Sequence, residues 1–103
     1  MSDAPAYVVA NFTIHDKDEY RKYENGFFPI LKKHGGSFFT YDDNTVHFEG
    51  AEPRPGRMVI FQFPSATAAE AWYNDPEYQA LSEHRRAGTS LISLTMVHGL
   101  PPR

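Results

Sequence analysis

Apolar and polar residues alternate along several short segments of the chain. Between Tyr7 and Ile14, one set of side chains falls on one side of an extended backbone (Val8, Ala10, Phe12 and Ile14) and the rest on the other (Tyr7, Val9, Asn11 and Thr13). Successive side chains of a strand point to opposite faces, so this period of two predicts a β-strand. The same reasoning predicts strands at 37–41, 57–63 and 89–97. Thr45–Glu49 is also expected to be extended, either continuing 37–41 past a bulge or forming a hairpin partner.

A longer segment repeats apolar residues at helical spacing. Asp16 is suited to the N-cap of this helix, Glu19 follows three positions later, and Gly35–Gly36 is suited to end it. Pro29 lies inside the segment and has no backbone N–H, so a kink is expected about one turn earlier, near Gly26. The apolar stripe consists of Tyr20, Tyr23, Phe27, Ile30, Leu31 and His34.

A second helical region is predicted between the third and fourth strands. Ser65 is suited to cap a helix over 66–73. Asp75 and Pro76 then restart the helix, with the acid as cap and the proline at the first helical position. Gly88 is expected to end it.

The predicted elements follow the order βαββαβ in a single domain over 1–103, with its core at about 6–99. With right-handed crossovers, this order gives a four-stranded antiparallel sheet with two helices on one face, the ferredoxin-like α+β sandwich.

Helices on one face leave the other face of this sheet uncovered, and that face is also apolar. If Val59, Phe61 and Phe63 meet the helices, then Met58, Ile60, Tyr7 and Val9 do not. We therefore expect a homodimer in which two copies pack through the open sheet face around a two-fold axis, as a dimeric α/β barrel. Asn11, Thr13 and Gln62 share this face. They indicate either a small-ligand pocket or a wet interface whose polar groups pair across the two-fold.

Composition narrows the class of protein. The 103 residues carry a net charge of −3 and no cysteine, which excludes disulfides, thiol nucleophiles and thiolate metal sites. The sequence has no basic stripe of the kind that binds nucleic acids and no apolar run long enough to span a membrane. It also shows no secretory signal, so a cytoplasmic protein is expected. The histidines lack metal-ligand spacing, so neither a metal nor a cofactor is expected. The fifteen aromatic residues are many for a small core, and some are expected to line an interface or a pocket.

An ordered set of short motifs resembles the domain of unknown function 1330 family, a member of the dimeric α/β-barrel superfamily. The set comprises Tyr20 with Tyr23, Pro29, His34-Gly35-Gly36, Glu49-Gly50, Phe63-Pro64-Ser65, Ala71-Trp72-Tyr73, Pro76-Glu77-Tyr78-Gln79 and an arginine at 85 or 86. The resemblance implies the ferredoxin-like fold and the barrel dimer. Relatives in the superfamily include cofactor-free monooxygenases, lactone isomerases, haem-degrading enzymes and stress-response proteins, so the resemblance implies no single activity.

Two pairs of residues are candidates for chemistry. His47 and Glu49 lie two apart on an extended segment and would share a face, as a general acid/base pair or as a solvated pair on an edge strand. Arg85 and Arg86 end the second helical region, where cations suit the helix dipole. One of them is expected to pair with Glu49 or to clamp a substrate carboxylate.

Two functional hypotheses follow. The first is a protein that binds a small organic metabolite, between sheet and helices or at the dimer barrel, and performs no chemistry. The second is a cofactor-independent monooxygenase or isomerase acting on a small aromatic or lactone-like substrate. A purely structural dimer or regulatory module is a third possibility. The candidate ligand-binding residues are Asn11, Gln62, Trp72, Tyr78 and Arg85, of which Trp72 is also a candidate core residue.

Overall fold

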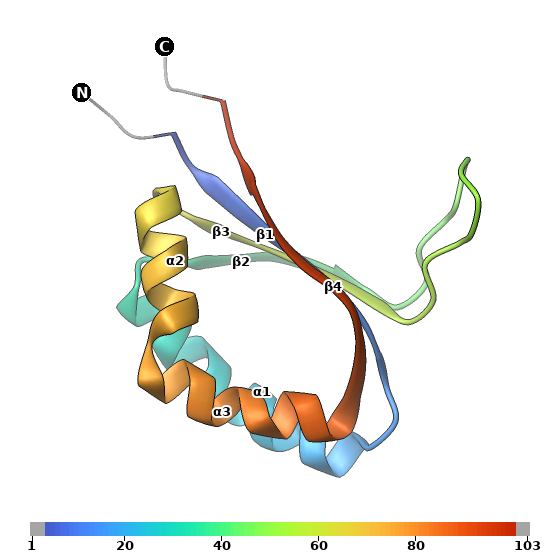
Figure 1. Cartoon of the computed structure of the whole chain (residues 1–103), viewed down its shortest axis with the longest axis horizontal. Helices are drawn as coiled ribbons and strands as arrows, with labels where there is room; N and C mark the ends of the chain where they lie inside the picture. The colour runs from blue at the N-terminus through green and yellow to red at the C-terminus, as the bar shows by residue number, and fades with distance from the viewer. Residues whose placement is uncertain (1–3, 101–103) are drawn as a thin grey trace.

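The strands and helices follow one another in the predicted order. The computed structural model describes residues 4–100. Its elements are β1 (Ala6–Ile14), α1 (Lys17–Lys33), β2 (Ser37–Asp42), β3 (Arg57–Phe63), α2 (Ala66–Asn74), α3 (Pro76–Gly88) and β4 (Thr89–His98). The four strands form one antiparallel sheet in the order β2-β3-β1-β4, and the helices lie on one side of it (Figure 1). The ferredoxin-like fold is confirmed.

The helix boundaries agree with the capping residues. The side chain of Asp16 accepts a hydrogen bond from the backbone N–H of Glu19, and Ser65 accepts one from Ala68. Asp75 accepts one from the N–H of Glu77 and separates α2 from α3. These side chains satisfy N–H groups that the first turn leaves without partners, so they fix where each helix begins.

Helix α1 continues through Pro29 and ends at Lys33. Gly26, near which the sequence predicts a kink, lies where α1 approaches α3. A Cβ at Gly26 would lie 2.8 Å from the side chain of Leu81, so the glycine allows α1 and α3 to pack closely. The two helices therefore pack side by side on the sheet.

The core lies between these helices and the inner face of the sheet. The alternation assigned the inner face correctly, because Val8, Ala10, Phe12, Val59, Phe61 and Phe63 are all buried. Trp72 of α2 is only 1% exposed and packs against Phe61 and Tyr78, with ring centroids 5.1 and 4.1 Å away. The core is therefore built largely from aromatic rings.

The expectation of an extended Thr45–Glu49 is wrong. Strand β2 ends at Asp42, β3 begins at Arg57, and the segment between them is an irregular loop that projects from the body (Figure 1). The bidentate ion pair between Arg57 and Asp43, with N···O distances of 2.6 and 3.0 Å, closes the base of this loop. Thr45–Glu49 therefore lies in the loop beyond the paired ends of β2 and β3, where no strand is adjacent to it.

A charged cluster joins the end of α1 to the start of α3. Asp75 Oδ2 lies 2.7 Å from His34 Nε2 and 3.0 Å from Lys33 Nζ. Hydrogen bonds from His34, from Lys33 and from the N–H of Glu77 lower the pKa of Asp75 to about 2. The ionised carboxylate therefore stabilises the contact between the two helices.

Replacing Asp75 with asparagine should reveal this contribution through its pH dependence. Asparagine keeps the N-cap but removes the charge. Because the pKa of Asp75 is depressed in the folded state, its stabilisation is present above about pH 4 and is lost as the pH falls to about 2. The melting temperature of wild type should exceed that of Asp75→Asn at pH 6, and the difference should shrink between pH 4 and 2. Circular-dichroism melts measure this. A difference that is constant over this range would contradict the assignment, and Asp18→Asn, an exposed acid in α1, is the control.

Candidate functional site

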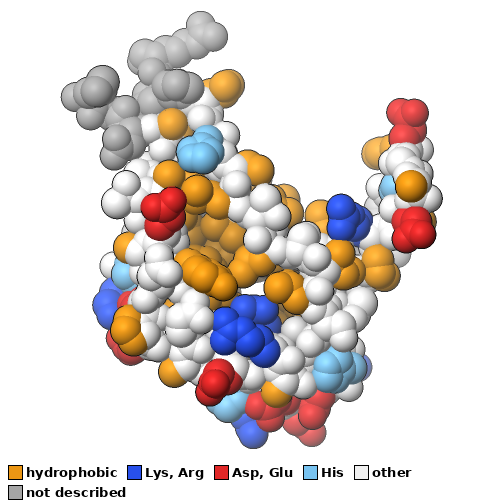
Figure 2. Space-filling model, in the orientation of Figure 1, with side chains coloured by type: hydrophobic (Ala, Val, Ile, Leu, Met, Phe, Trp, Pro, Cys, Tyr) orange, Lys and Arg blue, Asp and Glu red, His pale blue; other side chains and the backbone are white. Residues whose placement is uncertain are grey.

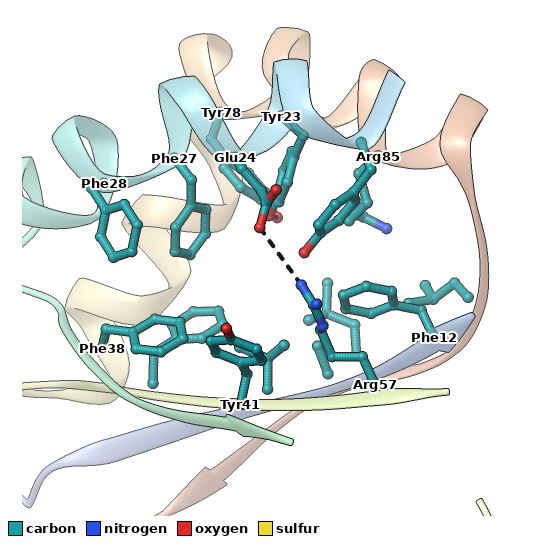
Figure 3. Close-up of a pocket in the computed structure, with 16 residues that line it drawn as sticks. Phe12, Tyr23, Glu24, Phe27, Phe28, Phe38, Tyr41, Arg57, Tyr78 and Arg85 are labelled. Atoms are coloured by element: carbon teal, nitrogen blue, oxygen red, sulfur yellow. Dashed lines mark hydrogen bonds and ion pairs between the residues drawn. The ribbon is translucent and has the colours of Figure 1, made fainter. Parts of the chain in front are cut away.

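An aromatic pocket lies between the inner face of the sheet and the helices α1 and α3 (Figure 3). Its volume is about 170 Å³. Aromatic side chains form most of its wall, from α1 and α3 on one side and from the strands on the other (Figure 3). The lining residues are Ala10, Phe12, Tyr20, Tyr23, Glu24, Phe27, Phe28, Phe38, Tyr41, Arg57, Val59, Phe61, Tyr78, Arg85, Leu91 and Leu94.

Arg57 forms the polar part of the sheet side of this aromatic pocket. Its guanidinium pairs with Asp43 and stands 4.5 Å from the centroid of the Tyr41 ring. It also lies 3.6 Å from the carboxylate of Glu24 of α1 (Figure 3). The hydrogen bonds from Arg57 lower the pKa of Asp43, and the same contact raises the pKa of Arg57. Arg57 is thus neutralised by protein acids and spans from the sheet to α1.

Phenol groups are among the polar groups on the helix side of the pocket. The hydroxyls of Tyr23 and Tyr78 lie 2.9 Å apart and share a hydrogen bond. Burial raises the pKa of Tyr20 to about 12 and the pKa of Tyr23 well above its usual value. Both phenols therefore stay protonated at neutral pH. In this form they can take part in hydrogen bonds with a ligand.

A second and more open hollow lies between α2, α3 and β4. Its volume is about 620 Å³. Figure 2 shows apolar side chains inside it and a lysine or arginine group at its margin. Trp72, Arg86 and Met96 line it, and three further lining residues, Arg85, Leu91 and Leu94, also line the aromatic pocket. The two cavities therefore meet at these three side chains.

The predicted ligand-binding residues divide between the two faces of the sheet. Tyr78 and Arg85 line the aromatic pocket, and Trp72 lines the second hollow while packing in the core. Asn11 lies on the opposite face, where its Nδ2 donates to the carbonyl oxygens of Pro55 and Arg57 at 3.0 and 3.1 Å. Gln62 pairs with Tyr7 in the sheet and also lies on that face. Asn11 thus holds the β2–β3 loop, and neither amide reaches a cavity described above.

His47 and Glu49 are both exposed on the β2–β3 loop. The Nε2 of His47 lies 3.3 Å from the carbonyl oxygen of Gly50, and neither residue lines either cavity. The expected contact between Glu49 and an arginine is also not formed. Arg86 donates to the side-chain oxygen of Gln79 at 2.8 Å, and Arg85 is buried against Tyr23. The loop holds Glu49 away from the end of α3, so this expectation is wrong.

Sequence reasoning missed most of the aromatic pocket. The pattern places Tyr20, Tyr23 and Phe27 on the apolar stripe of α1 and does not distinguish core positions from pocket positions. Tyr41 and Arg57 were assigned only to strands. The available signal was the number of aromatic residues, which exceeded what a small core needs.

Over residues 4–100, no three His, Cys, Asp or Glu side chains come together in a way that could hold a metal ion. None of the helices in this part of the chain is long and apolar enough to cross a membrane.

Comparison with known proteins identifies the fold and a family. The family model described as a domain of unknown function, DUF1330, matches residues 5–100. A protein of unknown function from Rhodopseudomonas palustris superposes with a TM-score of 0.79 at 18% identity, covering 97% of this chain and 85% of that one. SnoaB, a cofactor-independent oxygenase from Streptomyces nogalater, gives a TM-score of 0.66 at 12% identity and covers 96% of each chain.

A third structure, a dimeric ferredoxin-like protein of unknown function from Thermobifida fusca, gives a TM-score of 0.50 at 13% identity. The match covers 93% of this chain and 90% of that one. No curated protein matches this chain.

Proposed function

Because this chain belongs to the DUF1330 family, a domain of unknown function, its role has to be inferred from its own pocket; we propose that it binds a small aromatic organic molecule between its sheet and helices. The observation that carries this proposal is the aromatic wall of a pocket of about 170 Å³. Ligand pockets are mostly apolar cavities with a few convergent polar groups, and this one has the phenol groups of Tyr20, Tyr23 and Tyr78 and the guanidinium of Arg85.

The pocket volume limits the size of the ligand. An engineered apolar cavity of about 150 Å³ in another protein binds benzene. A pocket of about 170 Å³ therefore suits one substituted six-membered ring. Ring faces and edges from Phe27, Phe38 and Phe61 would pack against such a ring.

Benzamide, a neutral single-ring probe, should bind with a dissociation constant on the order of 1 mM. Replacing Phe28 with alanine should weaken binding about three- to tenfold, because the pocket loses one aromatic contact. Phe28 is 48% exposed, so the fold should tolerate the change. A titration followed by ¹H–¹⁵N NMR measures the affinity.

The matched control is Phe48→Ala. Phe48 is 89% exposed on the β2–β3 loop and lines neither cavity, so its loss should leave benzamide binding unchanged. If wild type shows no saturable shifts with benzamide, or if both variants weaken binding equally, the aromatic pocket is not the binding site.

A second candidate function is cofactor-independent oxygenation of a small aromatic substrate. The similarity of the fold to SnoaB supports it, as do the protonated phenols in the pocket, which could donate hydrogen bonds to a substrate oxygen. Such an activity would consume dioxygen faster in the presence of catechol and protein than with catechol and heat-denatured protein. Equal rates would favour binding without chemistry.

We also propose that the functional unit is a homodimer formed through the open face of the sheet, and that it acts in the cytoplasm, as the sequence suggests. Apolar residues on this face include Tyr7, Val9, Phe39, Ile60 and Val97. Phe39 and Val97 remain 64% and 45% exposed in the single chain, so the face has no cover of its own. The dimeric ferredoxin-like protein from T. fusca supports a second copy as the partner. The pocket opens on the other side of the sheet and would stay accessible in such a dimer.

A further inference from the structure

Arg85 is buried without an acidic partner. Its residue is only 5% exposed, and its Nε has no hydrogen-bond acceptor. Within residues 4–100, none of the ion pairs includes Arg85, whereas Arg57, the other arginine of the aromatic pocket, is paired with Asp43 and Glu24. The two arginines of one pocket therefore differ in whether the protein neutralises them.

A buried cation without a counter-charge is costly, and the Nε of Arg85 has lost its water without gaining an acceptor. Two features compensate for the charge in part. Arg85 lies in the last turn of α3, where the helix dipole favours a cation, and its guanidinium carbon lies 5.9 Å from the centroid of the Tyr23 ring. Neither feature provides an acceptor for the N–H groups.

Arg85 also stands where the two cavities meet, since it lines both of them. The second hollow is bordered by another buried donor without an acceptor, Nε1 of Trp72. The carboxylates on the two cavity walls are Glu24, which is near Arg57, and Glu70, which forms no ion pair with Arg85. Arg85 thus brings a positive charge and an unused donor to the wall of the aromatic pocket, and Trp72 adds a second unused donor to the wall of the adjoining hollow.

We propose that Arg85 is the anion-binding subsite of this pocket, and that the ligand is a small aromatic acid. Its ring packs among the aromatic side chains, and its carboxylate takes the acceptor position that the protein leaves empty beside Arg85. A planar guanidinium binds a carboxylate through two parallel hydrogen bonds, which matches this class of ligand. The inference rests on the proposed function, because it requires that the pocket bind an aromatic ring.

The test compares benzoate with benzamide, two probes of nearly equal size that differ in charge. At pH 7, wild-type protein should bind benzoate at least about tenfold more tightly than benzamide in a ¹H–¹⁵N NMR titration. Arg85→Gln should remove this preference, to within about twofold, while benzamide binding persists. Arg21→Gln removes the same charge from an exposed position of α1 and should keep the preference intact.

The outcomes separate the two proposals. If benzamide does not bind wild type, the proposed function fails. If benzamide binds but benzoate binds no more tightly, or if Arg85→Gln keeps the preference, only the anion subsite is overturned. Should Arg85→Gln not fold, Arg85→Lys replaces it. Lysine keeps the charge but lacks the planar pair of donors, so most of the preference should be lost, and a preference equal to that of wild type would overturn the assignment.

Discussion

Replacing Trp72 with alanine is expected to destabilise the folded chain by about 3–5 kcal/mol, the cost typical of truncating a fully buried tryptophan. Trp72 is 1% exposed, and its ring lies within 6.4 Å, centroid to centroid, of Phe27, Phe61, Phe63 and Tyr78. Alanine would leave a cavity at the point where α2 packs on the sheet. Because the whole stability of a small domain is about 5–15 kcal/mol, this loss is a large part of it.

Urea denaturation followed by circular dichroism measures this effect. Trp72→Phe should cost clearly less than alanine, since a ring still fills most of the site. Tyr73→Ala is the matched control, because Tyr73 is the next residue of α2 and is 39% exposed. A cost for Trp72→Ala no larger than that for Tyr73→Ala would show that Trp72 does not hold α2 on the sheet.

Introducing lysine at Phe39 is expected to separate the proposed homodimer into monomers. Phe39 is 64% exposed and packs edge-on against Tyr7 on the open face of the sheet, with ring centroids 6.3 Å apart. In the dimer, two copies of the charge would be buried in an apolar interface, where an unpaired ammonium is strongly unfavourable. In the single chain the same lysine would lie in water, so the fold itself should survive.

Light scattering coupled to size exclusion measures the molecular mass directly. Wild type should give twice the 11.7 kDa of one chain, and Phe39→Lys should give a single chain with an unchanged circular-dichroism spectrum. Phe48→Lys, at another exposed phenylalanine but on the β2–β3 loop, should remain dimeric. A monomeric wild type at all concentrations would contradict the dimer.

The sequence predicted the architecture well because short-range patterns determine it. The alternation of Val8, Ala10 and Phe12 identified the inner face, and Asp16, Ser65 and Asp75 cap the predicted helices. These features depend on neighbours along the chain and on the periods of strand and helix. They therefore carry enough information without any knowledge of tertiary contacts.

The aromatic pocket could not be predicted from the sequence, because it depends on contacts between distant residues. A buried tyrosine that fills a core and one that lines a pocket give the same stripe on α1, so Tyr23 could not be distinguished from Leu31. The alternation pattern places Asn11 on the open face of the sheet. No neighbouring residue in the sequence indicates that its side chain donates to the carbonyl oxygen of Pro55, 44 positions away. Arg85, a ligand candidate from the sequence, does line a cavity, but its lack of an acidic partner is visible only in the folded chain.

The central claim is that the ligand binds on the side of the sheet that the helices cover. Locating a bound aromatic ring tests this claim most directly. Isotope-filtered nuclear Overhauser spectra of the protein with benzamide report which side chains contact it. We expect contacts with the ring protons of Phe27 and Phe61 and with the methyl groups of Leu94, which line the aromatic pocket. Contacts instead with Val9 and Ile60, which pair on the opposite face of the sheet, would contradict the account.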